Sequence, residues 1–181
     1  MKHAIAALGS VLVLMLSLPG YGQNQQQPAT LRSLLLHELH TTHNKADWFV
    51  PISVAVDGLT AEQASWQPPA GGHSAGQSTY HLLFWNRRSL AKLKGETQEK
   101  FGGDNEETFV KFDSKQWSDT VRQLDQVMTD LEKLVESADE QKLAVWAPTI
   151  GNICTHNAYH VGQIVYVRKL QGSWNPEKGV K

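Results

Sequence analysis

The sequence predicts an all-α protein whose domain is a four-helix bundle. Four long segments carry apolar residues at helical spacing between recognisable start and stop signals. None of the chain has a convincing strand pattern. Removal of an expected 22-residue leader from the 181 residues leaves 159, which suits one domain with a substantial core.

The first helical segment is predicted to run from about Leu31 to Asp57. Thr30 marks its start, and an apolar stripe of leucines opens it. Pro51 lies inside this pattern and predicts a kink or a break. Gly58 ends the segment, since glycine readily adopts the conformation that terminates a helix.

The second long segment is predicted from about Ser74 to Leu93. Ser74 and Gln77 have the spacing of a capping box, and Gly95 is the stop signal. Before it, Thr60 and Gln63 form a second capping box and predict one short turn of helix.

A long polar loop, from Glu96 to Phe112, precedes the third segment, which is predicted from about Ser114 to Ser137 with Asp113 or Ser114 as its cap. Its apolar residues keep a regular a/d spacing, and charged residues occupy the other face. The fourth segment is predicted from about Ile150 to Leu170, after Pro148.

The N-terminus has the anatomy of a secretory signal peptide. Lys2 precedes an apolar run, and small residues allow cleavage after Gly22. An uncleaved anchor is the alternative, but a polar stretch follows at once and the apolar run is short for a membrane span. We therefore expect a secreted or periplasmic protein. The expected organisation is a signal peptide (1–22), a polar linker (23–30), a four-helix domain (31–174) and a C-terminal tail (175–181).

The composition excludes several classes of function. Without Lys2 the mature chain has 16 Lys and Arg against 18 Asp and Glu, and no basic stripe, so we expect no nucleic-acid partner. No second apolar run is long enough for a membrane span, so we expect no stable membrane insertion after signal removal. Cys154 is the only cysteine, which excludes an intrachain disulfide.

Two histidines on the fourth segment have the spacing of metal ligands. His156 and His160 are four residues apart and therefore lie on one helix face, inside the apolar stripe that includes Ile153 and Ile164. A metal ion would satisfy both rings, and the alternative is a pair of core histidines bonded to carbonyls or water. Cys154 lies about 200° around the helix from His156 and is expected to be a small buried residue.

His81 on the second segment is a third candidate ligand, because it too interrupts an apolar face. Helices of a bundle can direct such side chains to one point in the core. Three imidazoles with an open fourth position are typical of a catalytic zinc site. The ligand types do not separate zinc, nickel, iron and manganese.

The other histidines form a weaker pattern. His37, His40 and His43 on the first segment could make a rival site, but their place near the start of the mature chain favours a polar helix face. His73 precedes a helix cap and is interpreted as a loop residue.

Three segments, in order, resemble the DinB-like superfamily, which includes YfiT-type metal-dependent hydrolases and bacillithiol transferases. They are Gly58–Pro68, then His73-Ser74 followed by His81–Trp85, and finally His156–Ile164, the most specific of the three. The resemblance extends from about Leu31 to Trp174.

This resemblance implies a four-helix bundle whose single divalent transition-metal ion is held by His81, His156 and His160, with water or substrate in the fourth position. It implies a metal-dependent hydrolase or a thiol or group transferase acting on a small molecule, and a homodimer is in keeping with many members. A non-catalytic bundle that binds a metal or a small ligand is the alternative. The transferases use cytosolic thiols, which does not agree with an export signal. The sequence does not identify a general base.

Overall fold

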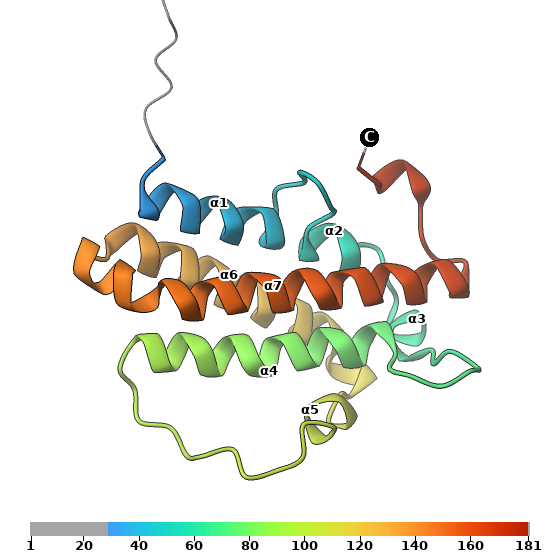
Figure 1. Cartoon of the computed structure of the whole chain (residues 1–181). Helices are drawn as coiled ribbons and strands as arrows, with labels where there is room; N and C mark the ends of the chain where they lie inside the picture. The colour runs from blue at the N-terminus through green and yellow to red at the C-terminus, as the bar shows by residue number, and fades with distance from the viewer. Residues whose placement is uncertain (1–28, 181) are drawn as a thin grey trace, which may run out of the picture.

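The protein is all-α over the residues that the structure describes, which are 29–180 of a computed structural model. This part of the chain contains no strand, so the predicted fold class is confirmed. Figure 1 shows the arrangement of the helices. They are α1 (Leu31–His43), α2 (Ile52–Val56), α3 (Ala61–Ser65), α4 (Ala75–Leu93), α5 (Glu107–Val110), η1 (Ser114–Gln116), α6 (Trp117–Ser137), α7 (Glu140–Gln171) and η2 (Pro176–Lys178).

Four helices, α1, α4, α6 and α7, are longer than the others and surround one core. Both α1 and α4 pack against α6 and against α7, so the four follow one another around the core in the order α1, α6, α4, α7 (Figure 1). α4 and α7 run in opposite directions side by side. Large apolar side chains with almost no exposure fill the centre, including Leu39, Leu82, Met128 and Ile164. Burial of this kind contributes about 1.5–3 kcal/mol for each large side chain.

The predicted capping boxes are present. The Ser74 hydroxyl accepts from the backbone N–H of Gln77, whose side chain accepts from the backbone N–H of Ser74. Thr60 and Gln63 make the same reciprocal pair at the start of α3. These caps satisfy backbone donors that a helix start otherwise leaves without partners. The first box fixes the start of α4 and so the position of the helix that carries His81.

The prediction of one helix from Leu31 to Asp57 is wrong. α1 already ends at His43, with Asn44 as its C-cap, and a loop separates it from α2. Pro51 is the N-cap of α2. Because proline has no N–H and disfavours helical backbone in the residue before it, the chain leaves the helix before Pro51 and re-enters it afterwards.

The last long helix begins ten residues earlier than predicted, at Glu140 instead of Ile150. Asp139 is its cap and accepts from the backbone N–H of Lys142 at 2.8 Å. Pro148 therefore lies inside α7. Proline there removes the donor to the Ala144 carbonyl, but both residues are exposed, so water can replace the lost bond.

The expected signal peptide and most of the polar linker lie outside the described residues. Within the described range, none of the helices combines the length and the hydropathy that crossing a membrane requires.

Candidate metal centre

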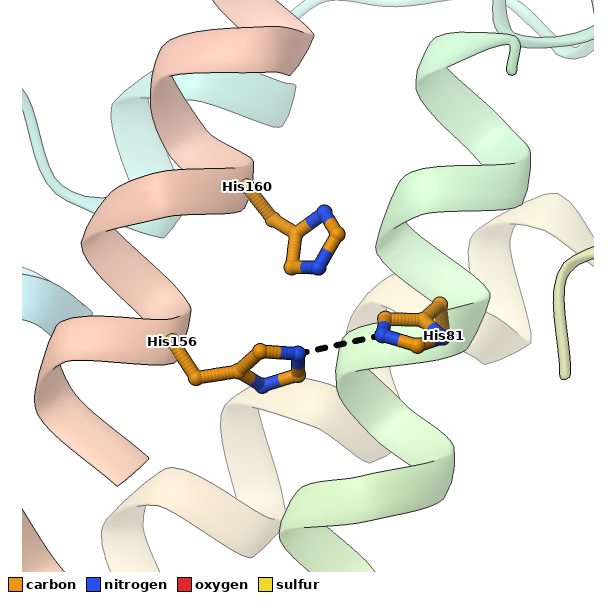
Figure 2. Close-up of side chains that lie close together, drawn as sticks. All are labelled: His81, His156 and His160. Carbon is orange, nitrogen blue, oxygen red and sulfur yellow. Dashed lines mark hydrogen bonds between the residues drawn. The ribbon is translucent and has the colours of Figure 1, made fainter. Parts of the chain in front are cut away.

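The structure brings His81, His156 and His160 together between α4 and α7 (Figure 2). One ring nitrogen of each lies within 4.8 Å of the others, and the Nε2 atoms of His81 and His156 are 3.0 Å apart. The side chains of His81 and His160 are buried, and that of His156 is half-buried. The side chains that were selected from helical spacing thus converge on one point and could hold a metal ion.

Thr108 orients the ring of His81. Its hydroxyl donates to the Asn105 carbonyl at 2.6 Å, so its oxygen accepts from Nδ1 of His81 at 2.5 Å. With the proton on Nδ1, the lone pair of Nε2 is directed toward the other two histidines. Hydrogen bonds of this kind on the far nitrogen are typical of metal-ligating histidines.

All three imidazoles are neutral near pH 7, which is the state that binds metal. Burial lowers the pKa of His81 to about 3, and repulsion from His160 and His156 acts in the same direction. Burial, followed by repulsion from His156, lowers the pKa of His160 to about 4. Burial also lowers the pKa of His156.

The donor set fits a divalent ion. Nitrogens bound at about 2.1 Å in a tetrahedral arrangement lie about 3.4 Å apart, close to the 3.0 Å between His81 and His156. Nδ1 of His160 is buried and has no hydrogen-bond partner. A buried nitrogen without a partner costs about 1–3 kcal/mol, so the protein itself does not fully satisfy the polar atoms of this cluster.

The segment from Asn105 to Phe109 covers one side of the cluster. It belongs to the polar loop whose length is unusual for a compact bundle, but the sequence does not indicate which of its residues reach the site. Phe109 is stacked between two imidazoles, 3.9 Å from the ring of His81 and 3.7 Å from the ring of His73. His73 in turn bonds the Glu106 carboxylate at 2.8 Å. His73 is therefore part of the site wall, whereas the sequence indicated only a loop residue. Its place at the start of α4, two turns before His81, was the available signal.

A cavity of about 710 Å³ adjoins the three histidines. It is lined by α4, by α7 and by the segment from Asn105 to Phe109. Trp85 and Tyr159 contribute aromatic walls. This volume lies in the range of small-molecule sites. Besides the three histidines, its titratable lining residues are His73, Lys92, Glu106 and Tyr159.

The helix-one histidines do not join this site. His37 and His40 are on the outside of α1, as a polar face predicts, but the same interpretation is wrong for His43, which is only 2% exposed. His43 bonds Glu132 at 2.7 Å and Asp125 at 3.0 Å, on the opposite side of the core. The sequence did not indicate these partners because they lie more than 80 residues away.

Two other α7 residues have structural roles. Cys154 is buried as expected, and burial raises the pKa of its thiol to about 12, so it stays protonated and unreactive. Asn157 accepts a hydrogen bond from Asn86 of α4 at 2.8 Å and contacts Met128 of α6. It joins three helices rather than supporting the histidines.

The class of protein follows from this arrangement: an all-α protein that could hold one metal ion between two antiparallel helices. A comparison with family models matches residues 52–164 to the DinB superfamily, and the chain belongs to it. The match covers more than half of the chain and includes all three histidines, whereas α1 precedes it. Neither the curated proteins nor the solved structures contain a significant match.

Proposed function

We propose that this chain is an exported metal-dependent enzyme, a hydrolase or a group transferase, that holds one divalent transition-metal ion through His81, His156 and His160. The observation that carries the proposal is the convergence of three histidine ring nitrogens at the wall of a cavity large enough for a small molecule. Imidazole donors suit zinc, nickel, iron and manganese alike.

The ion, when bound, supplies Lewis-acid chemistry that makes water or a thiol more acidic and polarises a carbonyl. Thr108 holds His81 in the ligating tautomer. Phe109 and Trp85 exclude water from two sides of the cluster. His73, held by Glu106, places an imidazole in the cavity lining outside the cluster.

An open coordination position would separate this proposal from the non-catalytic alternative. We expect cobalt-substituted protein to bind about one equivalent and to change its visible spectrum when acetohydroxamate or 2-mercaptoethanol is added. That result would justify screening hydrolytic and thiol-transfer substrates. A spectrum that neither compound changes would indicate a closed four-ligand site and would contradict the enzymatic proposal.

Export is part of the proposal and has its own measurement. If residues 1–22 are a signal peptide, the protein recovered from the periplasm or medium of a bacterial host will begin at Gln23. Intact-mass analysis distinguishes this form from the full chain. Recovery of the uncut chain in the cytoplasm alone would contradict export.

A further inference from the structure

The cavity beside the three histidines continues along the groove between α4 and α7. Its α4 side follows one stripe from His81 through Trp85 and Ser89 to Lys92. At 1.5 Å per residue, Lys92 lies about 16 Å along the helix from His81. On α7, Thr149 lies about 10 Å before His156. A ligand that reaches the histidines can therefore extend over this length.

The two ends of the groove differ in chemistry. Aromatic rings surround the histidine end, whereas Ser89, Lys92, Thr149 and Asn152 supply hydroxyl, ammonium and amide groups at the far end. All residues that line the cavity belong to the described part of the chain, and Glu106 is the only carboxylate among them. Glu106 is bonded to His73, near the histidine end. The far end of the cavity thus has a positive charge with no acid of its own.

Lys92 has no ion pair among the described residues. Next to the cavity, a smaller hollow shares Trp85, Ser89 and Lys92 with it and adds Arg88 and Glu96. The charges of Arg88 and Glu96 cancel, so the ammonium group of Lys92 gives the far end of the cavity a net positive charge. An ammonium group beside three neutral donors is suited to an anionic group that reaches it from the cavity.

We infer that the substrate is an elongated small molecule with a metal-binding group at one end and a carboxylate or phosphate at the other, recognised by Lys92. This inference rests on the proposed metal site and adds the substrate class to it. An apolar or neutral polar segment joins the two ends, because Trp85 and Ile153 line the stretch between them.

The test uses zinc-loaded mature protein and a hydroxamate as metal-binding group. Sebacic monohydroxamic acid carries a carboxylate at its far end, and its methyl ester is the neutral counterpart of equal length. A phosphonate and an amine of the same length complete the set. Calorimetry should give about fivefold tighter binding for the carboxylate than for the ester. The expected difference is modest because Lys92 is exposed, so water screens its charge. The phosphonate arm tells which anion fits better, and the amine should bind most weakly.

Substitutions at Lys92 test whether this side chain causes the tighter binding of the carboxylate. Lys92→Met keeps the aliphatic stem and should reduce the advantage to less than about twofold, whereas Lys92→Arg should retain it. Lys94→Met, an exposed lysine outside the cavity lining, is the matched control and should behave as wild type.

The outcomes separate the two proposals. If the ester binds only when metal is present but the carboxylate binds no better, or if Lys92→Met keeps the advantage, the anion site is wrong and the metal site stands. If the ester fails to bind, or binds equally after EDTA treatment, the metal site is wrong and the anion site falls with it.

Discussion

The variant His156→Ala is expected to lose stoichiometric metal binding. Purified wild-type protein should contain about one equivalent of a transition metal by elemental analysis, or take it up when zinc, nickel or manganese is added. Without His156, the two remaining donors lie on different helices, and a two-ligand site binds far more weakly than a three-ligand site. His156 is also the least buried of the three, so its truncation leaves the core intact.

The chain offers a matched control in His73→Ala. His73 lines the same cavity and is separated from His81 only by the ring of Phe109, yet it is outside the three-histidine cluster. We expect this variant to keep its metal. Equal metal content in wild type and His156→Ala would contradict the three-histidine site, and loss of metal from His73→Ala would show that the ligand set is larger.

The three candidate ligands could be selected from the sequence because the relevant signal is local. Helical periodicity alone places His156 and His160 on one face of α7 and puts His81 on an apolar face of α4. Whether these two faces meet depends on how the helices pack. The sequence pattern indicates that packing only indirectly, through the predicted four-helix bundle. The comparison with the DinB superfamily supplies further support, since its match includes α4 and α7 as far as residue 164, with all three histidines.

The rest of the site could not be predicted, because it depends on contacts between distant segments. Thr108 and Phe109 belong to the polar loop whose length indicates a mobile or functional segment without naming a residue in it. Their partners His81 and His73 lie about 30 residues earlier. Caps at Ser74 and Thr60 were predicted because they join residues three apart. The sequence therefore predicts the contacts between residues close together in the chain and misses the contacts between distant segments.

The helix boundaries at prolines were the weakest part of the prediction. The sequence predicts a kink or break at Pro51 inside the first segment and a helix start after Pro148 for the fourth. At Pro51 the helix is interrupted by a whole loop, whereas Pro148 is accommodated within α7. Pro148 is on the surface of α7, where water can reach the carbonyl that loses its donor. Pro51 instead occupies the N-cap of α2, where a helix needs no N–H from that residue.

The buried imidazole of His43 leads to the second large prediction. It lies between two carboxylates, with Glu132 at 2.7 Å and Asp125 at 3.0 Å. Within residues 29–180, the one other ion-pair partner of these three side chains is His40, 3.9 Å from Glu132. Burial opposes the charged form, but hydrogen bonds and attraction to Glu132 and Asp125 outweigh it and raise the pKa of His43 above 6.5. The side chain of Glu132 is only 12% exposed, so little water screens this pair.

Replacing Glu132 by glutamine should destabilise the protein in a pH-dependent way. Because the pKa of His43 is higher in the folded state, its stabilising contribution is complete below pH 6.5 and is lost as the pH rises through the folded value. We therefore expect Glu132→Gln to cost about 2 kcal/mol at pH 6 and clearly less at pH 8.5, where neutral His43 can still bond the glutamine. Urea unfolding at both pH values measures the difference.

The control is Glu136→Gln, which removes an exposed carboxylate one turn further along α6. It should change the free energy of unfolding by no more than about 0.5 kcal/mol at either pH. An equal loss at both pH values in Glu132→Gln would mean that His43 is not charged in the folded protein. A loss confined to low pH would identify α1 as held to α6 by a charged pair, on the side of the core away from the metal centre. Stability and metal binding would then fail separately: Glu132→Gln would weaken the fold and still bind metal, whereas His156→Ala would fold and not bind it.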